Sequence, residues 1–326
     1  MRLSKPLKTL KTLTSTVSTT HRPAATAARA TGLALSALAA LTALTAIPPA
    51  AHATEGGLTT AAAGAEGFLA GALPPPGSYG LVYVNHYRAD RFNNGQGDSA
   101  VPGFKVQATA VVGRVVWMSD TPVAGGQFGA YGVLPLVDLK VDAAGASDSR
   151  TALGDPELGA LVAWHGPEWH HAAALAVVAP TGAYDRTRLA NTGNHHWTLR
   201  PVFVASYLNA AGLDASAKIT YSINGRNDDT DYRSGQYLHA DFNLGQRVAP
   251  DWQVGLQGML IHQTTDDKQA GAVVGDGMRT RVLALGPAVR WQSPAGVSLE
   301  AKLLKETAAR WHTQGTALWL KAVWKL

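Results

Sequence analysis

The stretch Ala215-Ser-Ala-Lys-Ile-Thr-Tyr-Ser-Ile-Asn224 alternates apolar and polar side chains at every position. Successive side chains of a β-strand point to opposite faces, so this stretch would have one apolar face and one polar face. The same period of two recurs in residues 197–207, 237–244 and 297–303. These four stretches predict an all-β fold, because an amphipathic helix would repeat at about 3.6 residues.

About twelve strands are expected in total, within a range of roughly 10 to 14. Their predicted ranges are 78–90, 103–119, 125–141, 154–165, 168–179, 197–209, 213–225, 235–248, 251–264, 279–293, 296–307 and 314–326. Long connections are expected near 91–102, 142–153, 180–196, 226–234, 265–278 and 308–313, and short ones near 120–124, 166–167, 210–212, 249–250 and 294–295. Long outer loops that alternate with short periplasmic turns are typical of outer-membrane barrels. The pattern therefore predicts a single antiparallel transmembrane β-barrel over residues 78–326, rather than a soluble sandwich.

The last strand supports the same reading. One of its faces is apolar and consists of Leu318, Leu320, Ala322, Trp324 and Leu326. An apolar final strand with aromatic residues resembles the signal that the barrel-assembly machinery recognises, although that signal usually ends in Phe. Aromatic residues expected at strand ends, as in an interfacial girdle, are Tyr79, Trp164, Trp169, Trp197, Trp252, Trp291 and Trp311. The expected surroundings are outer-membrane lipid and lipopolysaccharide; the alternative for these aromatics is an ordinary sandwich core.

Residues 1–53 have the order of a secretory signal peptide. A basic region precedes an apolar stretch from Gly32 to Ile47, and Ala51-His52-Ala53 follows as an A-x-A cleavage pattern. The alternative, an uncleaved anchor, is disfavoured because the stretch is shorter than the roughly 20 residues needed to span a bilayer. Residues 54–77, rich in Gly, Ala and Pro, are expected to be an irregular segment that lies on the periplasmic side or enters the barrel as a plug.

Composition excludes several functional classes. Six of the 28 Lys and Arg residues lie in the predicted signal, which leaves 22 cations against 23 acidic residues, a net charge of −1. A near-neutral chain without a basic patch is not expected to bind nucleic acid. The chain has no cysteine, so thiolate metal sites, disulfides and cysteine nucleophiles are excluded.

Short motifs in the mature chain resemble the outer-membrane family of the meta-pathway of phenol degradation. In order they are Pro75-Pro76-Gly77-Ser78-Tyr79-Gly80, residues 87–91 (YRADR), 154–159 (GDPELG), 179–185 (APTGAYD), 221–224 (YSIN), 227–235 (NDDTDYRSG), 254–256 (VGL) and 286–287 (GP). The resemblance implies a barrel and suggests the uptake of aromatic or other small hydrophobic compounds. It singles out the loop residues Asp155, Pro156, Pro180, Thr181, Gly182, Asn227, Asp231, Ser234 and Gly235.

The polar faces of the predicted strands supply candidates for contact with a solute in the lumen. They are Arg200, Lys218, Asn224, Tyr237, His239, Asp241, Asn243, Gln253, Gln257, Arg281, Glu300 and Lys302. Their charges are mixed, which argues against a strongly ion-selective pore. The same residues would also suit a closed, hydrogen-bonded interior.

Two other chemistries are weaker alternatives. The run Asp228-Asp229-Thr230-Asp231 could bind Ca²⁺ or Mg²⁺, but it lacks the spacing of an EF-hand, and a loop held by its own hydrogen bonds is favoured. The pairs His170-His171 and His195-His196 are expected to be interfacial or solvated rather than metal ligands. No metal or cofactor is predicted.

A rim hydrolase would use Ser234, His239, Asp231 and Asp241, yet the sequence contains no G-x-S-x-G motif. No catalytic residue is therefore predicted. The favoured function is a passive, porin-like channel for small hydrophobic or aromatic compounds, with a lumen gated by the N-terminal segment. A structural or adhesive barrel whose loops bind a surface partner is the second hypothesis.

Overall fold

The computed structural model describes Glu55 and residues 61–326. The predicted signal peptide, residues 1–53, lies outside the described residues. Among the residues that are described, no helix is both long and apolar enough to cross a bilayer.

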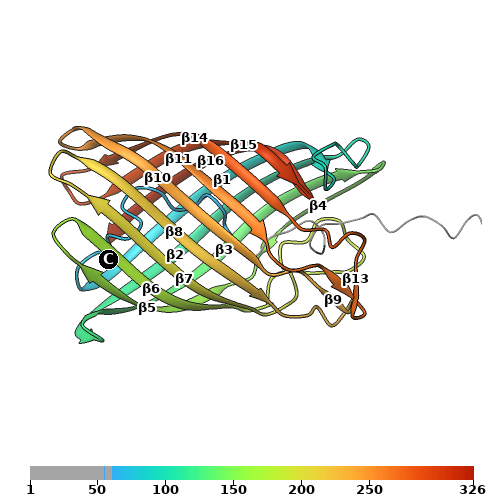
Figure 1. Ribbon diagram of the computed structural model, residues 1–326, viewed down its shortest axis with the longest axis horizontal. Helices are drawn as coiled ribbons and strands as arrows, with labels where there is room; N and C mark the ends of the chain where they lie inside the picture. Colours follow the sequence, from blue (N-terminus) through green and yellow to red (C-terminus); the bar gives the residue numbers. More distant parts are fainter. Residues whose placement is uncertain (1–54, 56–60) are drawn as a thin grey trace, which may run out of the picture. The chain divides into compact units, whose positions relative to one another are not determined.

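Twelve antiparallel strands form a closed barrel (Figure 1). They are β1 (Gly77–Asn93), β2 (Lys105–Val123), β3 (Gly126–Ala143), β5 (Glu157–His165), β6 (Trp169–Val178), β7 (Thr198–Leu208), β8 (Leu213–Asn224), β10 (Tyr237–Ala249), β11 (Trp252–Gln263), β14 (Arg281–Gln292), β15 (Ser298–Arg310) and β16 (His312–Lys325). Each strand pairs with the next barrel strand along the chain, and β1 also pairs with β16, which closes the ring. A closed ring leaves no unpaired strand edge in the lipid, where an unsatisfied backbone group is costly. The predicted antiparallel barrel of about 12 strands is confirmed.

Two of the predicted long connections are wrong. Most of residues 142–153 forms a further strand, β4 (Ala146–Leu153), which pairs with the second half of β3. The first half of β3 pairs with β5, so β4 and β5 follow one strand path that is interrupted at residues 154–156. Between β15 and β16 the chain turns at a single residue, Trp311, whose φ is 46°. Pairing with β3 makes a strand of Ala146–Leu153, whereas β15 and β16 reach Arg310 and His312 through pairing with β14 and β1.

The two ends of the barrel differ. At the end where β1 begins and β16 ends, called the short-turn end here, the strands join through connections such as Ala124-Gly125 and residues 209–212. Ala124 and Gly125 have φ values of 51° and 73°, as a tight hairpin turn requires. The opposite end, the long-loop end, carries residues 179–197 and 264–280. Its loops contain a small sheet made of β9 (Tyr232–Arg233), β12 (Lys268–Gln269) and β13 (Ala272–Val273).

The outer surface of the barrel is apolar. Phe203, Ile219 and Leu299, from the alternating stretches described above, are 47%, 42% and 43% exposed. Other large exposed apolar side chains on strands include Val115, Leu134, Leu158, Leu175, Leu199, Leu256, Leu303 and Leu320. Because these side chains face outward rather than into a core, the barrel presents the apolar band that lipid requires.

The inner surface has two kinds of wall. Strands β1 to β6 turn mainly apolar side chains inward, namely Leu81, Tyr83, Val112, Val116, Tyr131 and Leu161. Strands β7 to β15 turn many polar side chains inward, among them Ser216, Thr220, Asp241, Asn243, Gln257 and Lys302, together with apolar ones such as Ile261 and Val282. Since the outward side chains of β2 to β6 are also apolar, these strands lack the alternation that made β8 easy to recognise. Tyr79, expected in an interfacial girdle, belongs to this inner wall and is 8% exposed.

Candidate functional site: the lumen of the barrel

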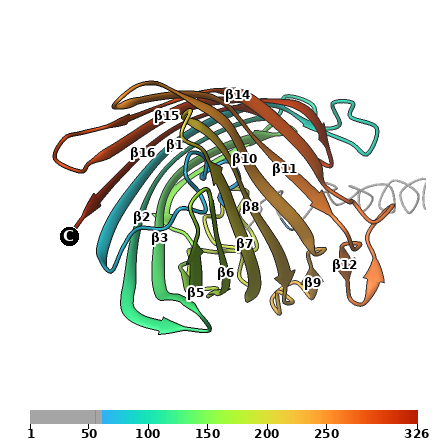
Figure 2. The same ribbon diagram turned by 60° about the vertical axis from the view of Figure 1, so that its left-hand side comes forward.

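A non-strand segment of the chain, residues 61–76, occupies part of the lumen; it is called the inner segment. Figure 2 shows it inside the ring of strands, coloured at the blue end of the scale. The backbone N–H groups of Gly64 and Glu66 donate to the two carboxylate oxygens of Asp241 on β10, at 2.7 and 3.0 Å. A segment without secondary structure needs such partners, because its backbone groups are shielded from water.

Two further backbone contacts hold the inner segment. The N–H of Leu69 donates to Asp214 on β8 at 3.0 Å, and the N–H of Gly71 donates to the hydroxyl of Ser206 on β7 at 2.8 Å. A Cβ atom on Gly71 would lie 2.6 Å from the backbone of Ala205 and Ser206, so only glycine allows this approach. The inner segment therefore lies directly against the polar wall of the lumen.

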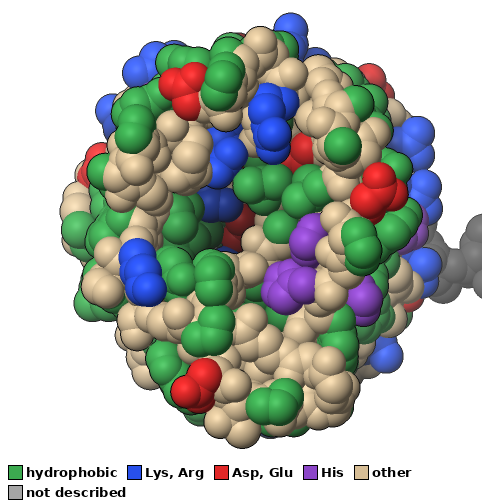
Figure 3. Space-filling view, turned by 90° about the vertical axis from the view of Figure 1, so that its left-hand side faces the viewer, with side chains coloured by type: hydrophobic (Ala, Val, Ile, Leu, Met, Phe, Trp, Pro, Cys, Tyr) green, Lys and Arg blue, Asp and Glu red, His purple; other side chains and the backbone are tan. Residues whose placement is uncertain are grey.

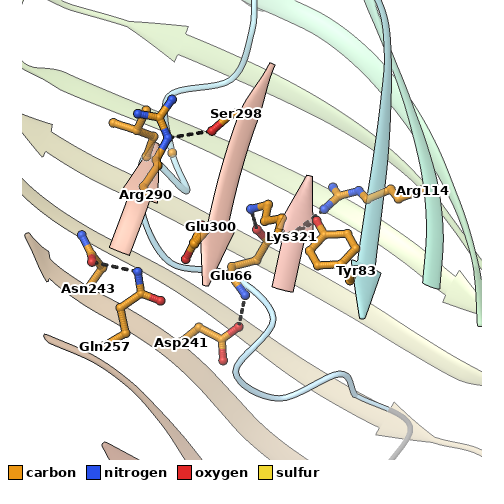
Figure 4. Close-up of polar contacts among 12 residues, drawn as sticks. Glu66, Tyr83, Arg114, Asp241, Asn243, Gln257, Arg290, Ser298, Glu300 and Lys321 are labelled. Atoms are coloured by element: carbon orange, nitrogen blue, oxygen red, sulfur yellow. Dashed lines mark hydrogen bonds and ion pairs between the residues drawn. The ribbon is translucent and has the colours of Figure 1, made fainter. Parts of the chain in front are cut away.

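The side chain of Glu66 forms the central ion cluster of the lumen (Figure 4). Its carboxylate lies 2.7 Å from Lys321 on β16 and 2.8 Å from Arg114 on β2, and it accepts the hydroxyl of Tyr83 at 3.1 Å. Burial alone would raise the pKa of Glu66, but the charges of Lys321 and Arg114 outweigh it and hold the pKa well below its usual range. Glu66 therefore stays ionised, and it is paired with two cations.

Glu55 contacts the loops at the long-loop end of the barrel. Glu55 accepts hydrogen bonds from the side chains of Tyr184, Asn227 and Thr230, at 2.9, 2.7 and 2.5 Å. Burial and the bond to Glu55 raise the pKa of the Tyr184 hydroxyl to about 12. Because β1 begins at the short-turn end, the inner segment leads from the loop side of the barrel toward the turn side.

A cavity of about 580 Å³ lies beside the inner segment. Its apolar lining includes Leu81, Val112, Val116, Val133, Leu161, Val202 and Val204, and its polar lining includes Glu66, Arg114, Glu157, Arg200, Lys218 and Lys321. The view into the short-turn end shows a hollow with apolar walls and Lys or Arg side chains in its depth (Figure 3). Volumes of about 300–1,000 Å³ with mostly apolar walls and a few polar groups are typical of small-molecule sites.

Eleven of the twelve side chains predicted to face the lumen do lie on the inner surface. Arg200, Lys218, His239 and Glu300 line the cavity. Asn224, Tyr237, Asp241, Asn243, Gln253, Gln257 and Lys302 are buried in the surrounding polar wall, each 5% exposed or less. Their contact with a solute stays a prediction. The prediction is wrong for Arg281, which is exposed, because β14 turns the neighbouring Val282 and Ala284 inward.

The loop residues singled out by the resemblance lie at the long-loop end and fix its loops. Asp155 accepts the N–H of Gly182 at 2.8 Å and the N–H of Asn194 at 2.7 Å, so residues 154–159 and 179–185 meet. A Cβ on Gly182 would lie 2.6 Å from the backbone of Gly154. The carbonyl of Pro156 accepts the N–H of Ala179, and Pro180 and Thr181 follow in the same loop. The remaining loop residues lie around Glu55 and the small sheet; they are Asn227, Asp231, Ser234 and Gly235.

The residues considered for a hydrolase have structural partners. His239 lies 2.6 Å from Asp241, whose oxygens also accept the backbone of the inner segment. Ser234 lies in the loops and contacts the N–H of Glu55. In the candidate metal loop, Asp228 and Asp231 both pair with Arg226. No cluster of three potential metal-ligating side chains occurs among the residues that the structure describes.

Sequence reasoning missed Arg114 and Glu66 as lumen residues. Arg114 is the single charge within the apolar run Val111-Val112-Gly113-Arg114-Val115-Val116. A lone arginine in a strand that is apolar on both faces indicates an inward-facing cation, and that signal was available. Glu66 lies in an irregular segment without periodicity, so no pattern could assign its direction.

The closed ring of twelve antiparallel strands and the apolar exterior define an outer-membrane β-barrel. The model of the family described as "Putative MetA-pathway of phenol degradation" matches residues 89–322. The chain belongs to this family, and the resemblance noted in the sequence is confirmed.

Among solved structures, the chain is similar to an outer membrane channel from Pseudomonas putida F1. The TM-score is 0.70 at 17% identity, over 77% of this chain and 96% of that one. The β domain of the Bordetella autotransporter BrkA matches more loosely, with a TM-score of 0.46 at 11% identity over 77% of this chain and all of that chain. No curated protein matches the sequence.

Proposed function

We propose that the protein is an outer-membrane channel for small hydrophobic or aromatic compounds. The observation that carries this proposal is the cavity of about 580 Å³, with its wall of Leu81, Val112, Val116 and Leu161 facing inward. An ordinary water-filled porin is lined by polar side chains, so an apolar inner wall favours solutes that bind apolar surface. The family and the channel from Pseudomonas putida F1 support the same class of function.

The inner segment would act as the gate of this channel. It is held in the lumen by hydrogen bonds to Asp214, Ser206 and Asp241 and by the Glu66 ion cluster. These contacts are few, and side-chain partners rather than strand pairing supply them. A shift of the segment along the wall would widen the path between the cavity and the loops. Recognition of the last strand by the assembly machinery and contact with lipopolysaccharide remain predictions.

Ion-current recording in planar bilayers tests this function directly, because neutral aromatics cross lipid unaided and would obscure a flux assay. The reconstituted protein should conduct, and millimolar benzyl alcohol should cause reversible blockades. Val204→Gln, on β7, should shorten these blockades by about tenfold, since it replaces an apolar side chain of the cavity lining with an amide. The outward-facing Val177→Thr is the matched control and should leave them unchanged.

Two results would contradict the proposal. A protein that is folded in the bilayer but never conducts would favour the structural or adhesive barrel, whose loops bind a surface partner. Blockades that respond equally to Val204→Gln and Val177→Thr would place the effect in the lipid rather than in the lumen. Catalysis has no part in this function.

A further inference from the structure

The cavity contains buried hydrogen-bond donors that the protein does not satisfy. The guanidinium of Arg200 is 5% exposed and pairs with Glu157 through Nη1, but its Nη2 has no partner in the described chain. The Nε of Arg114 is likewise unpaired. An unsatisfied buried donor costs about 1–3 kcal/mol, and more when it is charged. Such groups at the lining of a cavity therefore point to a ligand that accepts hydrogen bonds.

Four more polar atoms in the lining have no hydrogen-bond partner among the described residues. They are the indole N–H of Trp319 on β16, the hydroxyl of Thr220 on β8, Nδ1 of His239 on β10 and Oε1 of Glu300 on β15. The indole can only donate, and the hydroxyl can donate or accept. Three of the unpaired groups, on Arg114, Arg200 and Trp319, can only donate, whereas one, on Glu300, can only accept and lies 3.5 Å from the ammonium of Lys302.

Lys218 is a third cation of the cavity lining. Unlike the two arginines, it forms no ion pair or hydrogen bond within the described chain. It lies on β8, opposite Asp241 in the strand register, and it lines the cavity. Its charge acts on the Glu66 carboxylate, so it lies within electrostatic range of the central cluster. The nearby carboxylates have closer partners. Glu66 pairs with Arg114 and Lys321, and Glu157 pairs with Arg200. Asp241 contacts His239 and accepts the N–H groups of Gly64 and Glu66.

The formal charge of the lining is positive. Six cations line the cavity, namely Arg114, Arg200, Lys218, Arg290, Lys321 and Lys325, against four acidic residues, Glu66, Asp155, Glu157 and Glu300. Lys325 is exposed at the end of β16, so an excess of one positive charge lies in the partly enclosed part of the lining, where charges are screened less than at the surface. An anionic group would be attracted there, and a cationic group would be repelled.

The apolar and cationic parts of the site adjoin each other. The guanidinium of Arg114 lies over the ring of Tyr131, 4.4 Å from its centroid, and the Tyr131 hydroxyl donates to Glu157 at 2.9 Å. Glu157 in turn pairs with Arg200. The two arginines are therefore fixed beside the wall of Leu161 and Val133, which would contact an apolar ring.

We propose that the cavity binds aromatic carboxylates, with the ring on the apolar wall of β1 to β6 and the carboxylate between Lys218 and the free N–H groups of Arg114 and Arg200. A carboxylate has two acceptor oxygens and one negative charge, which match the unpaired donors and the excess of cations. This inference rests on the proposed channel function and narrows its solute class.

Three probes of similar size and different charge test it: benzoate, benzyl alcohol and benzylamine at pH 7. Dissociation constants are obtained by calorimetry on the full-length protein in detergent and from current blockades in bilayers. Benzoate should bind about tenfold more tightly than benzyl alcohol, and benzylamine more weakly than both. Lys218→Gln should weaken benzoate binding and so abolish most of its higher affinity over benzyl alcohol. The dissociation constant of benzyl alcohol should stay unchanged. Arg281→Gln removes the same charge from the outer surface and should change nothing.

The outcomes separate the two proposals. If benzyl alcohol binds and blocks, but benzoate binds no better or Lys218→Gln does not weaken it, the carboxylate site is wrong and the channel function stands. If none of the three probes binds or blocks, the channel function itself fails. Equal weakening of benzoate by Lys218→Gln and Arg281→Gln would show long-range attraction only, and would also overturn the site.

Discussion

The carboxylate of Glu66 lies 2.7 Å from the ammonium of Lys321, so a buried ion pair joins the inner segment to the last strand of the barrel. The two residues are far apart in the sequence, and the contact fixes the segment beside the cavity. Removing one partner of a buried pair is more destabilising than the pair itself is stabilising, because the other charge is left uncompensated. This asymmetry makes the contact a sensitive place to test the role of the segment.

Lys321→Met should loosen the inner segment and raise the single-channel conductance. Glu66 would keep only Arg114 as an ion partner, at an expected cost of about 3 kcal/mol. Planar-bilayer recording measures the effect. Lys325→Met removes a cation from the same cavity lining without breaking an ion pair, so it should leave the single-channel conductance unchanged. Equal conductance in the two variants would show that the Glu66 pair does not hold the segment.

Asp241→Asn should release the backbone of residues 64–66. An amide side chain has one acceptor oxygen in place of two, so one of the N–H groups of Gly64 and Glu66 would be left unsatisfied, at about 1–3 kcal/mol. Limited proteolysis in detergent should then cut the inner segment several times faster. Asp138→Asn, on the outward face of β3, is the control, and its cleavage rate should equal that of the unchanged protein. Identical cleavage of all three proteins would exclude Asp241 as the anchor.

Gly71→Val should displace the inner segment from β7. The new side chain would meet the backbone of Ala205 and Ser206 at 2.6 Å, and a strand of the barrel wall cannot move aside. We expect an intact barrel with a higher conductance. Ser206→Ala, which removes only the hydroxyl bonded to Gly71, should give a smaller change in the same direction. A closed Gly71→Val channel would contradict the proposed position of the gate.

Acid should weaken the docking of the inner segment only at low pH. The pKa of Glu66 is held well below its usual value near 4.5, so the ion cluster contributes its full stabilisation above that value. The contribution is lost as the pH falls through the lowered pKa. Conductance should therefore be constant from pH 7 to about 4.5 and rise below it. In Glu66→Gln the part of the conductance rise that protonation of Glu66 causes should be absent. An equal rise in that variant would show that another group causes it.

Phe203→Arg should destabilise the barrel in lipid. Phe203 lies at the middle of β7 and faces outward, where a cation costs about 2–4 kcal/mol. Urea-induced unfolding in lipid vesicles measures the change in free energy. The inward-facing Val202→Arg projects into the lumen and should cost less. A greater loss of stability in Val202→Arg would reverse the assignment of the two faces.

The barrel could be predicted from the sequence because lipid on one side and a polar interior on the other impose the alternation seen in residues 215–224. Strand β8 follows it, and its predicted bounds, 213–225, differ from Leu213–Asn224 by one residue. Strand β2 does not follow it, since Val112 and Val116 face the lumen and Val111 and Val115 face outward. The strand itself was still predicted. Because its sequence is apolar at nearly every position, the side chains that face the lumen, and hence the cavity, could not be recognised.

The polar site depended on contacts distant in the sequence. Arg200 and Lys218 were predicted to face the lumen because they lie on the polar face of an alternating strand, opposite the apolar face that meets lipid. Their grouping around Glu66 could not be predicted, because the position of residues 61–76 follows from hydrogen bonds to Asp214 and Asp241 rather than from any periodicity. Arg281 was misassigned because its polar character placed it inside, whereas the strand pleat turns it outward.

The inner segment lies in the lumen, and we expect it to limit passage through the barrel. The chain contains no cysteine, so Ala70→Cys, in the cavity lining, would carry the single thiol of the protein. A bulky charged thiol reagent added from the short-turn side of a single channel should react with it and reduce the current in one irreversible step. The lipid-facing Ala205→Cys should give no step. A thiol at residue 70 that reacts without any change in current would contradict the account.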